Sequence, residues 1–359
     1  MLGVFLRLVP RAGALLVVAL LAACASAPAA APAAPAAPPA AGAPAASPAA
    51  SSAPREKTNV VLRLGWLARG YDAPYYLALA RGYYDEAGLN VEIKEGQGSG
   101  PTLNLVAGGQ EQFGMVDGAV LLIGAAKGIQ ARMVAGIMER SPAALMVHAD
   151  SGIDTPKDLA GKTAGMVPGA NTTLLLPSYL DAVGVPQGSL TIINTDNANK
   201  TTLFRQHRYD VTSSLLNDEV VTLQVEGENI KALSFADGGV NTISVGIVTH
   251  PDLIQSNPDL VRRFVGASLR GWEEAIKSPA DAIDVLLQSY PNYKPEVATQ
   301  SLTTTIPLLH TKNTEGKPLG WMAREDWQET QDLLAKAGLV QDPVSLDSLY
   351  TNDFVPGAR

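Results

Sequence analysis

Short runs rich in β-branched residues alternate with helical segments from Asn59 onward, and this alternation restricts the possible folds most. Residues 59–66 (NVVLRLGW) and 89–96 (LNVEIKEG) have the apolar spacing of strands. The helix between them is predicted to begin after Asp72, which lies two residues before a proline, and to end at Gly88. Strands joined by helices of this length form βαβ units, so the chain is predicted to be an α/β protein with mainly parallel sheets.

The alternation occurs twice along the chain. The first series continues with two helices and two strands, at 101–109, 111–119, 120–128 and 131–138. A second series begins near Ser151, and its helices and strands are predicted at 168–185, 190–195, 199–210 and 211–216. Residues 251–359 are mainly helical in pattern. One domain typically contains about 100–200 residues, so two series in 359 residues predict two lobes.

The start of the chain has the pattern of an export signal. Arg7 and Arg11 precede an apolar run at 12–23, which is shorter than the roughly 20 residues that a membrane-spanning helix needs. Cys24, the single cysteine, directly follows the small residues of this run. The arrangement resembles a bacterial lipoprotein signal, which implies removal of 1–23 and lipidation of Cys24. An ordinary secretory signal with an incidental cysteine is the alternative.

The segment that follows Cys24 is predicted to be a disordered tether. Residues 25–54 contain 17 Ala and 8 Pro and carry no charge. Such a segment has no patterned apolar face to bury, and its prolines prevent a regular helix. We therefore expect 24–57 to link a lipid anchor to a globular body, which places that body outside the cytoplasm.

Composition excludes several classes of function. The chain has 27 Lys and Arg against 35 Asp and Glu, a net charge of −8, which argues against binding to nucleic acid. A single cysteine excludes a disulfide framework and a thiolate zinc site. The four histidines, at 148, 207, 250 and 310, lack the spacing of metal ligands. We therefore expect no metal and no cofactor.

Four segments together resemble the substrate-binding proteins of bacterial ABC importers, in the sulfonate, nitrate and thiamine-pyrimidine-precursor subgroup. They are APYYLALARGYYDEAGLNVEIKEGQGSG, FGMVDGA, SGIDTPKDLAGKTAGM and NPDLVRRFVGASLRGW, in that order. The resemblance covers about residues 59–345. It implies a two-lobed periplasmic-binding-protein fold of type II, with lobe one at 58–147 and 247–359 and lobe two at 148–246. Two crossover strands, near 146–148 and 246–248, would form the hinge.

The resemblance also implies partners and a mechanism. The protein is expected to be a monomer that captures a small molecule between its lobes and delivers it to a membrane permease driven by an ATPase. A lipoprotein that senses a ligand without transport is the alternative class. Fungal-type pyrimidine synthases of the same superfamily are enzymes that use an active-site histidine and a cysteine-rich motif. This chain has neither clustered histidines nor such a motif, so we expect no enzymatic activity.

Ligands of doubly wound sheets bind beyond the carboxyl ends of the strands. Residues that follow the predicted strands are therefore the candidate ligand contacts. They are Trp66, Tyr71, Tyr75, Gly98, Ser99, Asp117, Arg140, Asn171, Thr172, Asn217, Asp218 and Glu219. Weaker candidates are Arg69, Tyr76, Glu139, Ser141 and Asn241.

Each candidate has a chemical reason and an ordinary structural alternative. The aromatic rings suit a flat heterocycle or a protein core, and the Gly-rich turn at 96–100 suits an anion or a tight βα turn. Asn171 and Thr172 suit a ligand or a helix cap, and Asp117 suits a ligand or a solvated turn. Arg140 suits an anion or a surface ion pair, whereas Asp218 and Glu219 suit an amino group or a helix N-terminus.

The balance of these residue types favours one ligand class. The predicted cleft contains several acids and aromatics but only one plausible arginine, Arg140. A sulfonate or nitrate site would need arginines or helix N-termini. We therefore predict a neutral or cationic heteroaromatic ligand such as an aminopyrimidine, with a sulfonate, taurine or nitrate as the alternative cargo.

Overall fold

The computed structural model describes residues 57–358. The predicted signal peptide at 1–23, Cys24 and the tether up to residue 56 lie outside the described residues. The described residues belong to one compact unit. Within the described part, no helix is both long enough and apolar enough to cross a membrane.

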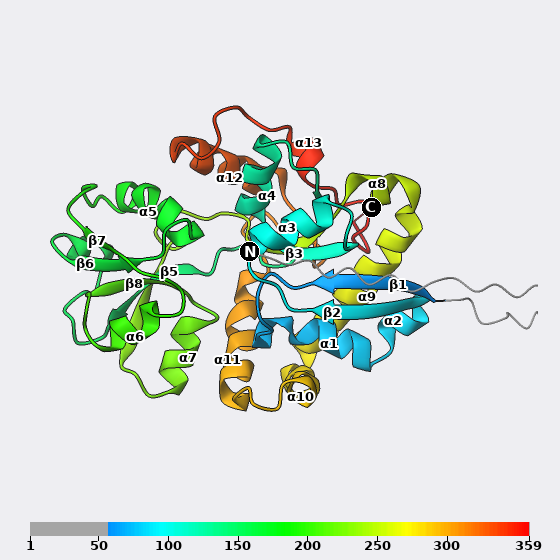
Figure 1. Cartoon of the computed structure of the whole chain (residues 1–359), viewed down its shortest axis with the longest axis horizontal. Helices are drawn as coiled ribbons and strands as arrows, with labels where there is room; N and C mark the ends of the chain where they lie inside the picture. Colours follow the sequence, from blue (N-terminus) through cyan, green and yellow to red (C-terminus); the bar gives the residue numbers. More distant parts are fainter. Residues whose placement is uncertain (1–56, 359) are drawn as a thin grey trace, which may run out of the picture. The chain divides into compact units, whose positions relative to one another are not determined.

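Two five-stranded sheets form the framework, and each defines one lobe (Figure 1). Lobe one has the strand order β2-β1-β3-β10-β4, with β1 (Thr58–Arg63), β2 (Leu89–Lys94), β3 (Phe113–Asp117), β4 (Arg132–Gly136) and β10 (Val245–Thr249). Lobe two has the order β7-β6-β8-β5-β9, with β5 (Ala143–His148), β6 (Thr163–Met166), β7 (Thr191–Asn194), β8 (Val211–Leu215) and β9 (Ile230–Ser234). The chain crosses between the sheets twice, at 137–142 and at 235–244.

The two-lobed α/β fold class is confirmed, and each sheet is mixed, with four of its five strands running in one direction. Strand β1 is parallel to β2 and β3, and β6 is parallel to β7 and β8. Strands β5 and β10, which each follow a crossing, are antiparallel to both of their neighbours. The sequence did not identify which strand of each sheet is reversed, because direction within a sheet depends on tertiary pairing, which local residue patterns do not encode.

The crossings lie elsewhere than the sequence predicts. Residues 143–148 pair with β8 and β9 inside the second sheet, so they belong to lobe two and not to a hinge strand. Strand β10 pairs only with β3 and β4 of lobe one. The hinge therefore consists of the irregular segments 137–142 and 235–244. All six residues of β5 are buried, and a fully buried run does not reveal which sheet it joins.

The strand directions place both carboxyl edges at the crossings. Strand β4 has the direction of β3, so the first crossing leaves lobe one at the edge where β1, β2 and β3 end. It enters β5 at the edge where β6, β7 and β8 end, because β5 is antiparallel to β8. The second crossing joins the same two edges. Residues that follow the parallel strands of the two lobes therefore face one another across the hinge.

Helices cover the faces of both sheets. The helices of the first part of lobe one are η1 (Gly70–Asp72), α1 (Ala73–Ala80), α2 (Tyr83–Glu86), α3 (Ser99–Ala107) and α4 (Gly118–Ala126). Those of lobe two are η2 (Pro156–Leu159), α5 (Asn171–Ala182), α6 (Lys200–Arg205) and α7 (Glu219–Val225). The C-terminal part contributes α8 (Pro251–Ser256), α9 (Pro258–Lys277), α10 (Pro279–Ser289), α11 (Pro295–Thr305), η3 (Ile306–Leu308), α12 (Arg324–Lys336) and α13 (Leu346–Leu349). Helix α11 packs against both η1 of lobe one and α7 of lobe two (Figure 1).

The core of lobe one is built around α9. Its Phe264 ring stacks on Phe113 of β3 at a centroid distance of 3.9 Å and on Tyr84 at 5.6 Å. Helix α1 crosses α9 so closely that a Cβ atom at Gly271 would lie 2.4 Å from the carbonyl oxygen of Pro74. The glycine therefore permits the contact that fixes α1, and with α1 the residues on its N-terminal side that face lobe two.

Candidate ligand-binding site

Trp66 lies in the loop that follows β1, and backbone hydrogen bonds to the loop after β2 hold it in place. The N–H of Gly96 donates to the carbonyl of Trp66 at 2.9 Å, and the N–H of Gly98 donates to Gly65 at 2.7 Å. A Cβ atom at Gly96 would lie 2.0 Å from the carbonyl oxygen of Leu64, so the two backbones touch. The loop holds the Trp66 side chain at the carboxyl edge, where 39% of the residue is exposed. The indole is therefore available to stack on a ligand.

Tyr71 and Asp72 follow in the short helix η1. Asp72 makes no cap bond to α1, contrary to its predicted role as the N-cap, and instead accepts a hydrogen bond from the backbone N–H of Arg69 at 2.9 Å. Burial raises the pKa of Asp72 to about 7. Burial also raises the pKa of Tyr71 well above its ordinary value, and the carboxylates of Asp72 and Asp218 add to this. Tyr71 thus stays a neutral phenol that faces the acids of lobe two.

One ion pair joins the lobes at this edge. Arg69 Nε donates to both carboxylate oxygens of Asp218, at 3.0 and 3.1 Å. Burial lowers the pKa of Arg69, but the attraction of Asp218 outweighs it, so the pKa is raised. Burial and the neighbouring Glu219 raise the pKa of Asp218, and Arg69 offsets this only in part. The pair therefore brings the lobes together at a desolvation cost.

Glu219 forms a separate ion pair within lobe two. Lys200 Nζ lies 2.7 Å from Glu219 Oε1 with only 9% of its side chain exposed. The other carboxylate oxygen accepts the N–H of Leu215 at 2.9 Å. Both acids after β8 are thus matched by cations of the chain, which removes most of the negative charge that they would offer to a ligand.

The residues after β2 and at the end of β3 bind one another. Ser99 Oγ accepts the backbone N–H of Asp117 at 3.1 Å, and Asp117 caps α4 by accepting the N–H of Ala119 at 2.9 Å. Burial raises the pKa of Asp117 to about 6. The N–H of Gly98 is already bonded to Gly65, so free backbone donors at this turn are limited to the first turn of α3.

Asn171 and Thr172 begin α5 in lobe two. The helix has no side-chain cap bond, so neither residue serves as the predicted cap. Asn171 is half-buried and Thr172 is buried. The N-terminus of this 12-residue helix lies at the carboxyl edge after β6 and offers N–H groups to an acceptor.

Three predicted contacts have structural roles instead. Tyr75 is fully buried and packs edge-on against Trp272 at 6.1 Å, because α1 turns this side chain into the lobe-one core. Asn217 is 1% exposed and donates to Thr305 of α11 at 2.9 Å, so it joins the lobes. Arg140 forms an ion pair with Asp237 between the two crossings, so its guanidinium is engaged.

The weaker candidates are mostly structural as well. Tyr76 shares a hydrogen bond of 2.9 Å with Tyr290. Asn241 accepts the N–H of Ser141 at 2.8 Å, and this hydrogen bond links the two crossings. Glu139 is 2% exposed, and neither of its carboxylate oxygens has a hydrogen-bond partner within the described part of the chain. Arg69 forms the interlobe ion pair described above.

Sequence reasoning missed Lys200, Glu95 and Tyr293. Lys200 lies in a segment predicted only as a helix, and its pairing depends on a residue 19 positions away. Glu95 accepts the N–H of Ala68 at 2.9 Å, and Tyr293 Oη accepts the N–H of Gly70 at 3.3 Å. Glu95 lies near the carboxyl end of the strand predicted at 89–96, which was a signal for it, whereas nothing local marked Tyr293.

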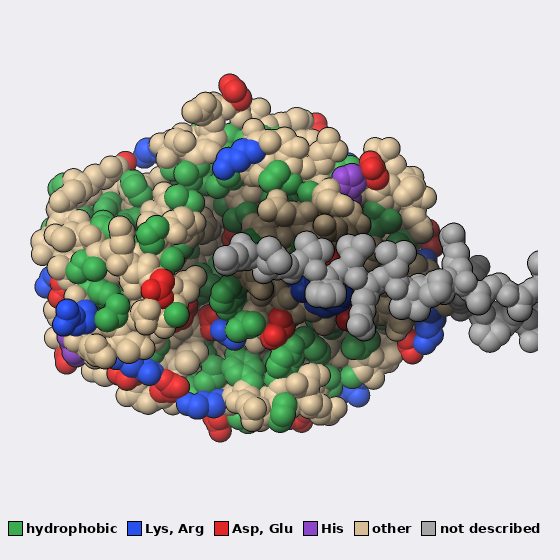
Figure 2. All heavy atoms as spheres, viewed as in Figure 1, with side chains coloured by type: hydrophobic (Ala, Val, Ile, Leu, Met, Phe, Trp, Pro, Cys, Tyr) green, Lys and Arg blue, Asp and Glu red, His purple; other side chains and the backbone are tan. Residues whose placement is uncertain are grey.

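These side chains lie at the facing carboxyl edges of the two lobes. In Figure 2 the surface is hollowed where lobe one and lobe two meet. Within residues 57–358, no group of three or more His, Cys, Asp or Glu side chains is arranged to hold a metal ion. The geometry fits a small organic molecule that contacts both lobes.

A family model described as NMT1/THI5 like matches residues 70–282. The chain belongs to this family. The riboflavin-binding protein RibY of Chloroflexus aurantiacus is 28% identical over 311 residues, which cover 83% of this chain and 86% of that protein. The formylaminopyrimidine-binding protein of Halalkalibacterium halodurans is 22% identical, and the match covers 82% of this chain and 89% of that protein. A 4-amino-5-hydroxymethyl-2-methylpyrimidine phosphate synthase of Legionella pneumophila is also 22% identical, and the match covers 84% of this chain and 93% of that protein.

Solved structures show the same fold. The alkanesulfonate-binding protein SsuA of Xanthomonas axonopodis pv. citri, bound to MOPS, matches with a TM-score of 0.65 at 17% identity. The match covers 82% of this chain and 99% of that protein. The two-lobed periplasmic-binding-protein fold is therefore established, and the family contains both binding proteins and enzymes.

Proposed function

We propose that the protein is an extracytoplasmic solute-binding lipoprotein of an ABC importer, which captures a flat heteroaromatic molecule between its lobes. The observation that carries this proposal is Trp66. Its indole is exposed at the carboxyl edge of lobe one, and it stacks on no other ring of the described residues. Tyr71 and the N-terminus of α5 lie at the same pair of edges and supply polar contacts.

The chemistry of the site favours a neutral ring system over a sulfonate. Arg69 is held by Asp218 in a partly buried pair, which leaves only Arg140, in an exposed and weak pair with Asp237, to attract an anion. Asp218 and Glu219 are likewise paired, so a strong cation is not favoured either. Riboflavin is the first candidate because a relative of 28% identity is named for binding it, and an aminopyrimidine is the second.

The proposed mechanism is hinge closure. A ligand that bridges the carboxyl edges favours the closed form, and a change from 1:99 to 99:1 requires a preference of about 5.5 kcal/mol. Stacking on Trp66 and hydrogen bonds from both lobes supply this preference. The closed protein then delivers the ligand to a membrane permease, and lipidation of Cys24 holds it at the membrane as a monomer.

We propose binding without catalysis. His148 ends β5 and His250 follows β10, both at the edges opposite the crossings, and His207 stacks on His148 at 4.0 Å. These three side chains lie away from the ligand. His310 is half-buried beyond η3, and burial lowers its pKa. Because these three histidines of the chain lie away from the ligand, we do not assign to it the activity of the synthases among its relatives.

Isothermal titration calorimetry on residues 53–359 tests the proposal, with riboflavin, an aminopyrimidine and an alkanesulfonate as separate ligands. We expect one of the two heteroaromatics to bind. Trp66→Ala should weaken that binding by about 1–3 kcal/mol, roughly 5- to 150-fold, which is the usual contribution of ring stacking. Trp321→Ala, in a half-buried tryptophan whose ring lies 5.0 Å from Lys317, is the matched control. Heat from the sulfonate alone, or equal affinities of the Trp66 variant and wild type, would refute it.

A further inference from the structure

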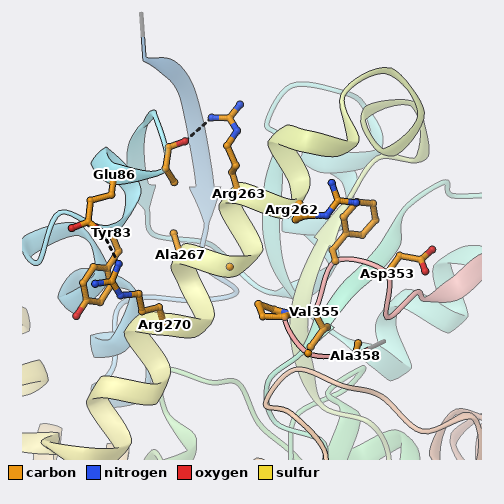
Figure 3. Close-up of a pocket in the computed structure, with 14 residues that line it drawn as sticks. Tyr83, Glu86, Arg262, Arg263, Ala267, Arg270, Asp353, Val355 and Ala358 are labelled. Atoms are coloured by element: carbon orange, nitrogen blue, oxygen red, sulfur yellow. Dashed lines mark hydrogen bonds and ion pairs between the residues drawn. The ribbon is translucent and has the colours of Figure 1, made fainter. Parts of the chain in front are cut away.

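A cavity of about 790 Å³ lies on lobe one, away from the interlobe site (Figure 3). Its walls are helix α9, the end of α2 and the C-terminal segment 353–358. Glu86 and Ala87 line it just before β2 begins at Leu89, so the cavity lies at the amino edge of the parallel strands. That edge is opposite the one that carries Trp66. The volume is in the range of about 300–1,000 Å³ that small-molecule sites occupy.

Three arginines of α9 line the cavity. Arg263 pairs with Asp259 at 2.9 Å and Arg270 pairs with Glu86 at 2.5 Å, and both acids are largely exposed. Exposed ion pairs of this kind contribute only about 0–1 kcal/mol, so the two acids compete weakly with a phosphate. Arg263 also donates to the carbonyl oxygen of Ala87 at 2.6 Å, and the Arg270 guanidinium lies 3.7 Å over the Tyr83 ring, so both side chains are held at the cavity wall. Arg262 has no carboxylate partner within residues 57–358, and its guanidinium lies 5.7 Å from the centre of the Phe354 ring.

The rest of the cavity is apolar and contains an unexplained glycine. Ala267, Phe354, Val355 and Pro356 form its apolar side. Gly266 lies in the middle of α9, where glycine costs about 0.5–1 kcal/mol relative to alanine. A Cβ atom there would meet only Pro356, at an ordinary distance of 3.9 Å, so packing does not require glycine. The missing side chain keeps the cavity open.

We propose that this cavity binds the headgroup and upper chains of an anionic phospholipid. The guanidiniums attract the phosphate, and the apolar side accepts the first methylene groups. Asp353 also lines the cavity, and its carboxylate accepts the hydroxyl of Thr351 at 3.0 Å. This acid disfavours a bare phosphate dianion and suits the hydroxyl groups of a glycerol headgroup, which points to phosphatidylglycerol.

The position of the cavity favours a membrane lipid over a dissolved anion. Lys57, the first described residue, pairs with Asp85 at 2.8 Å, and the N–H of Thr58 donates to Gly88 at 3.0 Å. The chain therefore joins lobe one beside the cavity wall. If Cys24 is lipidated, as the proposed function holds, the tether raises the local concentration of lipid at this end.

Vesicle co-sedimentation of residues 53–359, which lack the anchor, tests the proposal. We expect binding to vesicles of phosphatidylcholine mixed with phosphatidylglycerol and much weaker binding to phosphatidylcholine alone. Arg262→Gln/Arg270→Gln should lower partitioning about 30-fold, because each basic residue contributes about 1 kcal/mol at an anionic surface. Arg205→Gln/Arg324→Gln, which removes two paired arginines that do not line the cavity, is the matched control and should have a smaller effect.

Two further measurements separate the cavity from general surface charge. Gly266→Leu fills the cavity without changing charge and should lower partitioning, whereas Gly266→Ala should leave it nearly unchanged. Glycerol phosphate added as a competitor should displace the protein only weakly. Equal binding to both vesicle types, equal effects of the two double variants, or full binding by Gly266→Leu overturns the proposal. Because no cleft ligand is present, the outcome is independent of the calorimetric test of the proposed function.

Discussion

Glu139→Gln is expected to stabilise the protein in a pH-dependent manner. Glu139 lies in the first crossing, with 2% of the residue exposed and with no hydrogen-bond partner for either carboxylate oxygen within the described residues. Its carboxyl is close to Gly136, where a Cβ atom would lie 3.0 Å from Oε1. An ionised carboxylate in this position would be desolvated and unpaired, which is costly.

The size of the effect follows from the pKa. Burial raises the pKa of Glu139 from 4.5 to about 8, with Asp326 of α12 adding to the rise and Thr314 partly opposing it. The folded state therefore retains a proton that the unfolded state loses between these values. Stability from this group is fully present below pH 4.5 and is lost as the pH rises through about 8. At 1.36 kcal/mol per pH unit the loss is about 3 kcal/mol by pH 7 and about 5 kcal/mol above pH 8.

Glutamine has nearly the same shape and is neutral at every pH, so the variant avoids this loss. Urea unfolding of wild type and variant at pH 5, 7 and 9 should give a difference of at most about 1 kcal/mol at pH 5 and a growing advantage for the variant above it. Asp72 and Asp117 also have raised pKa values, but they contribute equally to both proteins. Glu329→Gln, at an exposed position of α12, is the control. A stability difference that does not change with pH would refute the reasoning.

Three other substitutions test the hinge, the loop contact that holds Trp66 and the core of lobe one. Asp218→Asn weakens the pair with Arg69, so small-angle scattering should show a larger radius of gyration without ligand; an unchanged radius would contradict an interlobe role. Gly96→Ala places a methyl group 2.0 Å from the carbonyl oxygen of Leu64 and should destabilise the fold by about 1–3 kcal/mol, which thermal unfolding measures; an unchanged Tm would show that this loop is not pinned. Phe264→Ala removes a fully buried ring and should cost about 3–5 kcal/mol in urea unfolding, whereas a cost below about 1 kcal/mol would place the core elsewhere.

The elements that sequence predicts well are those whose pattern is local. The strand predicted at 59–66 is β1 (Thr58–Arg63), and the strand predicted at 89–96 is β2 (Leu89–Lys94). In each, every second residue faces the core, and this spacing of two identifies a strand without any tertiary information. The family resemblance supplied the two-lobed architecture, which the pattern alone did not fix.

The features that sequence did not predict depend on distant residues. Strand β9 (Ile230–Ser234) lacks a clear alternation and is defined by pairing with β5, more than 80 positions earlier. The pair between Arg69 and Asp218 spans 149 positions. Tyr75 and Tyr71 have the same chemistry four positions apart, yet the turn from η1 into α1 sends the first into the core and leaves the second near lobe two.

The paired state of the cleft acids changes what the residue types imply about the ligand. Counted as single residues, Asp218 and Glu219 favour a cationic partner. In the structure Arg69 and Lys200 already bind them. A cationic ligand would have to displace one of these partners from a partly buried pair, and the cost of breaking that pair reduces its net binding free energy. Discrimination among ligands therefore depends on the groups that remain uncommitted, chiefly the Trp66 indole and the helix N–H groups. These groups select by ring shape and acceptor position more than by charge, which is why a flat, neutral heteroaromatic is the ligand to test first.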